Sequence, residues 1–218
     1  MVLVLPPQML KDIWPVGFYQ PIPKNACTSV KKEIFWHRFG FGFPEIPHWR
    51  RHGALIHIHQ VMPTRRVPLP TGEKCLVLVR DPISRFESAF REKVLFNEEF
   101  SDVSALSRRI QEVMVQVRCD SYDNRVLRDH FRPQCYWVAL LRPEDRVLVD
   151  CSEVGHFLHV KGTRANDSRT HTRRSRNTEL IAALTEVVGG LRDELYESYM
   201  NDVALVAEAN RKKHSRHK

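Results

Sequence analysis

The sequence predicts an α/β fold with a mostly parallel central sheet flanked by helices. Residues Cys75–Val79 and Val147–Val149 are continuous apolar runs, the pattern of strands that are buried on both faces of a parallel sheet. Segments with the spacing of amphipathic helices separate and follow these runs. Alternation of strands with helices is typical of α/β proteins.

The first part of the chain predicts one helix between irregular segments. Residues 1–17 indicate an irregular arm, and Phe18–Ile22 a short extended stretch. A helix is expected from about Ser29 to Phe39, with Gly40 at the position where helices stop. The many prolines and glycines of residues 40–73 indicate loops.

The second part is richer in helical signals. Asp81 and Pro82 supply an N-cap and a proline for the first helical position. Ile83, Phe86, Phe90 and Val94 then give that helix a core face. The remaining elements expected are a helix over Val103–Val117, two helices over Thr178–Val188 and Leu191–Asn210 separated by Gly189 and Gly190, and a frayed basic tail over 211–218. We therefore expect the arm, one domain over 18–210 and the tail.

The charge of the chain indicates an anionic partner. Its 34 Lys and Arg residues outnumber 26 Asp and Glu, giving a net charge of +8. Arginine, with 24 residues against 10 lysines, favours planar, bidentate contacts with phosphate or sulfate. Nucleic acid, an anionic polymer and an anionic small molecule all fit this charge.

The five cysteines do not form a recognisable framework. Their number is odd and no Cys-x-x-Cys pair occurs, which argues against a disulfide scaffold and a zinc ribbon. No apolar run reaches the roughly 20 residues of a membrane span. We expect a soluble, cytoplasmic protein that binds no metal and has no membrane span.

The segment Pro23–Ser29 has the composition of an anion-binding loop. It lies between an expected strand and an expected helix, where backbone N–H groups and the helix dipole favour an anion. Lys24 adds a mobile charge, while Thr28 and Ser29 add hydroxyl donors. The pattern is not a Walker A loop, because its glycines are absent. A capped helix with a surface lysine is the alternative.

A second basic cluster follows the buried strand at Cys75–Val79. Arg80 lies where that strand ends, the usual ligand edge of an open α/β sheet. Ser84, Ser88 and Arg91 share one face of the next helix. Together they can hold a phosphate from two sides; a structural Arg–Asp pair beside a solvated helix face is the alternative.

These two segments resemble the paired nucleotide-binding motifs of type-2 carbohydrate sulfotransferases. The first motif is Pro-Lys-Asn-Ala-Cys-Thr-Ser at 23–29. The second, at 79–91, consists of Val-Arg-Asp-Pro at 79–82, Arg85, and Ser-Ala-Phe-Arg at 88–91. His-Phe-Arg-Pro-Gln at 130–134, Tyr-Met-Asn-Asp at 199–202 and Asn-Asp-Ser at 166–168 resemble further family segments. The departures are Gln20 and Pro21, which predict a short or edge strand before the loop, and the membrane anchor of Golgi members, which is not found.

The resemblance implies a P-loop-like sulfotransferase fold and 3′-phosphoadenosine-5′-phosphosulfate (PAPS) as donor. The 5′-phosphosulfate would be held by the loop residues Lys24, Asn25, Ala26, Cys27, Thr28 and Ser29. Arg80 and Ser88 would hold the 3′-phosphate. Arg85, Asn166 and Ser168 would also contact the donor, and the basic run from Arg164 to Arg176 would help to neutralise it or form a solvated loop.

The general base is expected among the histidines. His57 and His59 share one face of a strand expected over Ala54–Gln60, and an imidazole has a pKa suited to accepting a proton at neutral pH. The pair resembles the His-x-His of uronyl 2-O-sulfotransferases, which implies His59 as base and His57 as its neighbour. The alternatives are a structural histidine pair, or His52, Glu87 or His130 as the base.

We therefore expect a PAPS-dependent O-sulfotransferase acting on a hydroxyl of a carbohydrate or glycoconjugate, with no nucleic acid as partner. The alternative from another class is a basic, non-catalytic module that binds nucleotides or nucleic acid. A P-loop kinase is disfavoured by the absence of the Walker A pattern. The alternative to a cytoplasmic enzyme is a soluble catalytic fragment of a Golgi-type enzyme.

Overall fold

The computed structural model describes residues 2–4, 18–40, 42–43, 50–51, 54–55, 58, 65–139, 141–154 and 178–216. The chain divides into two compact units. Unit 1 comprises 1–78 and 137–166, and unit 2 comprises 79–136 and 167–218. The chain passes from one unit to the other within strand β6 (Cys75–Val79) and within helix α7 (Gln134–Val138).

Unit 1 contains a small parallel sheet of three strands in the order β2–β6–β7. Strand β2 (Phe18–Gln20) pairs in parallel with β6, with Phe18 opposite Cys75 and Gln20 opposite Val77. All five residues of β6 are buried, as the continuous apolar run predicts. The other elements here are β1 (Val2–Val4), β3 (Arg50–Arg51), β4 (Ala54–Leu55), β5 (Arg65–Val67), β7 (Arg146–Asp150) and two short 3₁₀ helices, η2 (Pro143–Asp145) and η3 (Cys151–Glu153).

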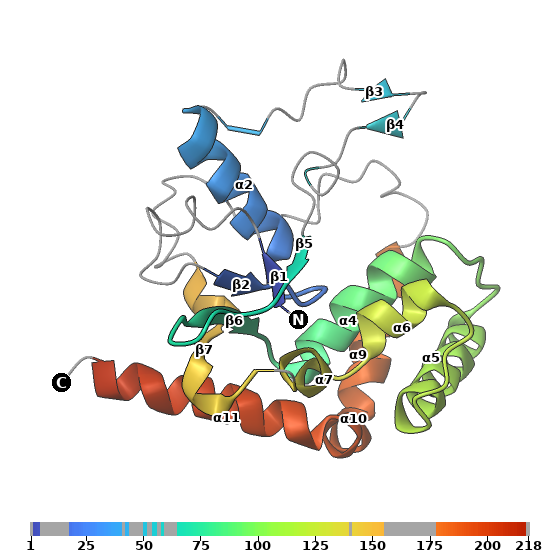
Figure 1. Cartoon of the computed structure of the whole chain (residues 1–218). Helices are drawn as coiled ribbons and strands as arrows, with labels where there is room; N and C mark the ends of the chain where they lie inside the picture. The colour runs from blue at the N-terminus through green and yellow to red at the C-terminus, as the bar shows by residue number, and fades with distance from the viewer. Residues whose placement is uncertain are drawn as a thin grey trace. The chain divides into compact units, whose positions relative to one another are not determined.

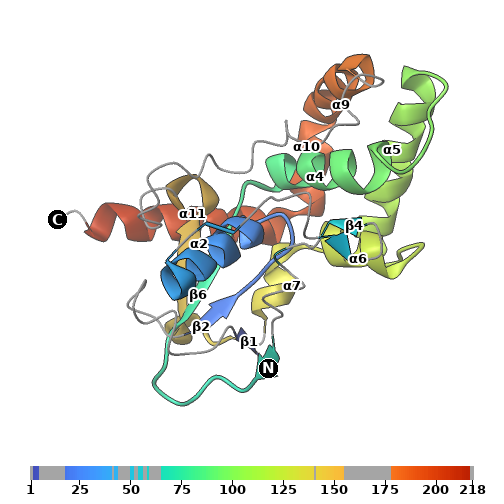
Figure 2. The same ribbon diagram turned by 90° about the horizontal axis from the view of Figure 1, so that it is seen from above.

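Helix α2 (Cys27–Phe39) covers this sheet (Figures 1 and 2). Its Val30, Ile34 and Phe35 join the core formed with β2, β6 and β7. The helix ends at Gly40, whose φ of 74° is left-handed and whose N–H donates to the Trp36 carbonyl. The predicted stop at Gly40 is thus confirmed; burial of this apolar face positions the start of α2 beside the ends of the strands.

Unit 2 is helical. Its elements are α4 (Pro82–Phe90), the π-helix η1 (Arg91–Leu95), α5 (Val103–Arg118), α6 (Arg125–Phe131), α9 (Thr178–Gly190), α10 (Arg192–Ser198) and α11 (Met200–Arg216). Helices α4, α5, α9 and α10 pack against one another (Figure 1). Phe86, Phe90, Phe131 and Tyr199 form an aromatic cluster in its core. The predicted Asp81–Pro82 start of α4 is confirmed.

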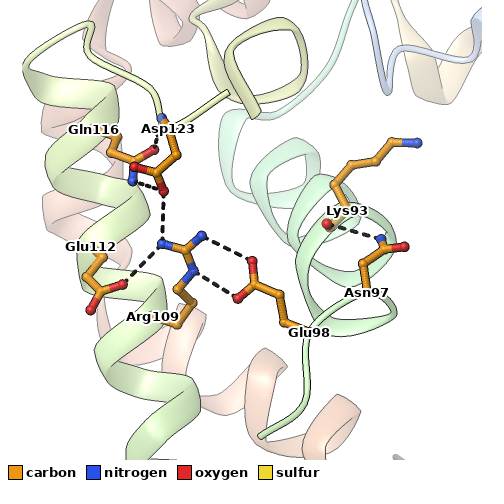
Figure 3. Close-up of polar contacts among 7 residues, drawn as sticks. All are labelled: Lys93, Asn97, Glu98, Arg109, Glu112, Gln116 and Asp123. Carbon is orange, nitrogen blue, oxygen red and sulfur yellow. Dashed lines mark hydrogen bonds and ion pairs between the residues drawn. The ribbon is translucent and has the colours of Figure 1, made fainter. Parts of the chain in front are cut away.

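A polar network anchors α5 to the loops around it (Figure 3). Arg109 makes a bidentate ion pair with Glu98, at 3.0 and 3.1 Å, and contacts Glu112 and Asp123 at 3.1 and 3.3 Å. Gln116 also bonds to Asp123 at 2.7 Å. These contacts raise the pKa of Arg109, mainly through Glu98. A network around one arginine stabilises more than isolated surface pairs do.

Several expected elements differ in the structure. Residues 1–17, expected to be irregular, contain β1, and the helix break expected at Gly189 and Gly190 is wrong because α9 includes both glycines. Strand β4 covers only Ala54–Leu55, and Ile58 is helical, so the strand expected up to Gln60 is wrong at that residue. The expected helix over Leu191–Asn210 is split into α10 and α11 at Tyr199. Helix α11 also runs to Arg216 where a frayed tail is expected, and the Glu208–Lys212 ion pair of 2.6 Å supports its later turns.

Among the residues that the structure describes, none of the helices has the length and apolar character needed to cross a membrane.

Candidate functional site

The loop between β2 and α2 has an unusual backbone. The Asn25 N–H donates to the Ile22 carbonyl at 3.1 Å, which closes a turn. Lys24 and Ala26 both have positive φ, 68° and 56°. The left-handed region costs a residue with a Cβ about 1–2 kcal/mol, and such strain is concentrated at functional sites. This conformation could not be predicted from the sequence, since neither residue is a glycine.

Asn25 fastens this loop to the sheet. Its side chain is fully buried, and its Nδ2 donates to the carbonyl of Leu78 at 2.7 Å. Leu78 lies near the carboxyl end of β6, the edge at which open α/β sheets bind ligands. The side chain of Asn25 therefore holds the loop in place, and its expected contact with the sulfate donor stays a prediction.

The start of α2 is polar and basic. Ala26 is the N-cap and makes no side-chain cap hydrogen bond to the helix. Cys27, Thr28 and Ser29 are half-buried, and the first turn contains no acidic residue. Burial raises the pKa of Cys27, while the nearby charges of Lys31 and Lys24 lower it. An anion is the ligand that such a helix start stabilises.

Unit 2 contains the second predicted half-site, at the start of α4. Asp81 caps this helix by accepting from the Ser84 N–H at 2.8 Å, and its other oxygen accepts from the Tyr196 hydroxyl at 3.2 Å. Arg80 and Ser88 are both half-buried. The carboxylate of Asp81 thus accepts hydrogen bonds from the start of α4 and from Tyr196.

Arg85 lies inside unit 2. Its side chain is 1% exposed. Burial lowers its pKa, while Tyr199 and Asp202 raise it. This buried position favours a role for Arg85 within the core of unit 2, near Tyr199 and Asp202. Contact between Arg85 and the sulfate donor stays a prediction.

A chain of hydrogen bonds holds the backbone of Arg80. Its role is not predicted from the sequence. The Gln134 side chain accepts from the Arg80 N–H at 2.9 Å and donates to the Arg80 carbonyl at 2.7 Å. Asp202 in turn accepts from the N–H groups of Gln134 and Cys135. The segments that contain Gln134 and Asp202 are visible in the sequence, but no local pattern shows that they meet Arg80.

Several predicted site residues lie outside the described residues. These are His57 and His59, His52, Asn166, Ser168 and the basic run from Arg164 to Arg176. Of the other candidate bases, Glu87 accepts from the Thr185 hydroxyl at 2.8 Å. The Nδ1–H of His130 donates to the Val126 carbonyl at 2.8 Å, which leaves its Nε2 as the acceptor nitrogen of the neutral ring.

A shallow depression of about 420 Å³ lies over α5, lined by Arg109, Glu112, Val115, Gln116 and Asp123. None of these is a predicted site residue, and four of them bond to one another in the network of Figure 3. Their polar groups are used within unit 2, so we do not regard the depression as the site. Within the described ranges, no three His, Cys, Asp or Glu side chains are grouped to hold a metal.

No protein-family model, curated protein or solved structure matches this chain.

Proposed function

We propose that this protein is a PAPS-dependent sulfotransferase that moves the sulfuryl group to a hydroxyl of a carbohydrate or glycoconjugate. The observation that carries the proposal is the loop before α2. Its left-handed Lys24 and Ala26, its attachment to β6 through Asn25, and the basic start of α2 suit the binding of a phosphosulfate.

In this proposal the reaction is an in-line displacement. The acceptor hydroxyl loses its proton to His59, with His57 as its neighbour, and its oxygen bonds to sulfur. The bond between sulfur and the bridging oxygen of the 5′-phosphate breaks, and 3′,5′-diphosphoadenosine leaves with that oxygen. Lys24 stabilises the charge on the leaving oxygen, and most of the rate comes from positioning and electrostatics, as in phosphoryl transfer.

A second group of residues is assigned to the 3′-phosphate of the donor. Arg80 and Ser88 would bind the 3′-phosphate, because a half-buried arginine and a hydroxyl suit charge-assisted contacts with phosphate. Asn166 and Ser168 would add contacts to the donor. The hydroxyl acceptor completes the set of proposed substrates, and no metal enters the reaction as proposed.

Nucleotide binding tests the donor assignment. In calorimetry with EDTA present, wild-type protein is expected to bind 3′,5′-diphosphoadenosine much more tightly than 5′-AMP. Arg80→Ala should weaken the first by about 2–5 kcal/mol and the second little. Arg142→Ala is the control for net charge, since this exposed arginine pairs only with its neighbours Glu144 and Asp145 in the described part of the chain. Equal affinities for the two nucleotides in the wild type would contradict the proposal.

A further inference from the structure

The side chain of Gln134 makes the hydrogen bonds to Arg80, the residue after β6, that a neighbouring strand would otherwise make. Its side chain is fully buried. Its Oε1 accepts from the Arg80 N–H at 2.9 Å and its Nε2 donates to the Arg80 carbonyl at 2.7 Å. The two bonds satisfy both backbone groups of Arg80, as strand pairing would, and so fix the direction in which the Arg80 side chain leaves the chain.

Gln134 is itself held by Asp202 of α11. The Asp202 carboxylate is fully buried and accepts from the backbone N–H groups of Gln134 at 2.7 Å and Cys135 at 2.8 Å. Nearby, the Tyr199 hydroxyl donates to the Phe131 carbonyl at 2.6 Å. The end of α6 and the start of α7 are therefore both held by residues at the α10–α11 junction (Figure 1).

Packing alone does not explain why a buried carboxylate and a buried amide occupy these positions. A buried carboxylate and a buried amide must be desolvated, and they are tolerated only when their hydrogen bonds are made. Apolar residues would fill the same space without that requirement. The bonds converge on the backbone of one residue, Arg80, whose side chain is half-buried and next to the start of α4.

We infer that Gln134 and Asp202 are positioning residues that set the preference for a 3′-phosphorylated nucleotide. They act through Arg80: the amide of Gln134 fixes its backbone, and Asp202 fixes Gln134. The inference rests on the proposed function, in which Arg80 binds the 3′-phosphate. A purely structural role would weaken the binding of every nucleotide alike, whereas a positioning role changes the ratio of two affinities.

The experiment measures the ratio of the dissociation constants of 5′-AMP and 3′,5′-diphosphoadenosine by calorimetry. Gln134→Met removes both bonds to Arg80 at similar side-chain length, and Asp202→Asn removes the charge that holds Gln134. Each is expected to lower the ratio by about tenfold or more, which is less than the loss expected when the Arg80 contact is removed outright. Arg118→Ala, an exposed arginine that contacts Glu194 and Ser198, should leave the ratio unchanged.

A double substitution separates action through Arg80 from other effects. In an Arg80→Ala background, Gln134→Met is expected to change the ratio no further. A ratio of dissociation constants near one in the wild type would contradict the proposed function itself. A high wild-type ratio that Arg80→Ala abolishes, but that Gln134→Met and Asp202→Asn retain, would overturn this inference alone. Failure of both variants to fold would also overturn it, because the chain would then serve folding and not specificity.

Discussion

Lys24 offers a test that separates the charge of a side chain from the strain of its backbone. Its φ of 68° is left-handed, so Lys24→Ala removes the ammonium and keeps the strain of a Cβ, while Lys24→Gly removes both. The left-handed conformation costs a residue with a Cβ about 1–2 kcal/mol, and glycine gives back about 0.5–1 kcal/mol through the entropy of its unfolded chain. The glycine variant should therefore be the more stable by about 0.5–1 kcal/mol.

The two variants should nevertheless lose the same activity. If the ammonium stabilises the leaving oxygen, both lower kcat by about 10²–10³. The assay is sulfate transfer from PAPS, with thermal unfolding in parallel; a difference of about 1 kcal/mol corresponds to a Tm higher by about 2–4 °C in Lys24→Gly for a chain of this size. Lys74→Ala, which removes an exposed lysine before β6, is the control.

Two results would refute this reasoning. Recovery of kcat in Lys24→Gly relative to Lys24→Ala would show that the backbone of the loop, not the ammonium, limits the reaction. Wild-type kcat in either folded variant would remove Lys24 from the proposed mechanism.

Three further predictions concern stability. Asn25→Ala leaves the buried Leu78 carbonyl without its 2.7 Å donor and should lower the free energy of unfolding by about 1–3 kcal/mol in urea titrations. Arg109→Ala removes the three ion pairs of a side chain that is only 19% exposed, and should cost about 1–3 kcal/mol near neutral pH, against less than about 1 kcal/mol for the exposed Arg118→Ala. Burial raises the pKa of Cys75 to about 12, so the unfolded thiol releases its proton first as pH rises. The free energy of unfolding should therefore fall by about 1.4 kcal/mol per pH unit above about pH 8.5, and Cys75→Ala should remove this part of the slope.

Each of these has a definite contrary outcome. Unchanged stability of Asn25→Ala would mean that its bond to Leu78 does not fasten the loop. Equal losses in Arg109→Ala and Arg118→Ala would deny the network any advantage over a single pair. An identical alkaline slope with and without Cys75 would show that its thiol titrates alike in both states.

The parts of the fold that the sequence predicts well have local signals. Cys75–Val79 is an unbroken apolar run and becomes the fully buried β6. Asp81 and Pro82 specify the start of α4 within three residues, and the cap bond to Ser84 follows. Gly40 stops α2 because its left-handed φ is available to glycine without strain.

Other features depend on contacts that no local pattern encodes. Helix α2 begins at Cys27, two residues before the predicted start, because Ala26 takes the left-handed cap conformation. The break between α10 and α11 falls at Tyr199, whose hydroxyl bonds to Phe131, 68 positions away. The role of Gln134 is set by Arg80, 54 positions away. In each case tertiary structure determines what propensity alone leaves open.

The sequence likewise predicts some features of the candidate site and not others. The sequence identifies the loop at 23–29 and the residues after β6 as basic segments at strand ends. It does not show that Asn25 turns inward to Leu78 or that Arg85 is buried, because the direction of a side chain depends on the packing around it.

Transfer of radiolabelled sulfate from PAPS tests the central proposal most directly. The purified protein would be incubated with labelled PAPS, EDTA and a panel of glycans and glycoconjugates. We predict label on a hydroxyl of at least one glycan acceptor, with release of one 3′,5′-diphosphoadenosine for each sulfate transferred, and loss of both signals in Lys24→Ala. Tight binding of PAPS without transfer to any acceptor, or transfer that persists in Lys24→Ala, would contradict it.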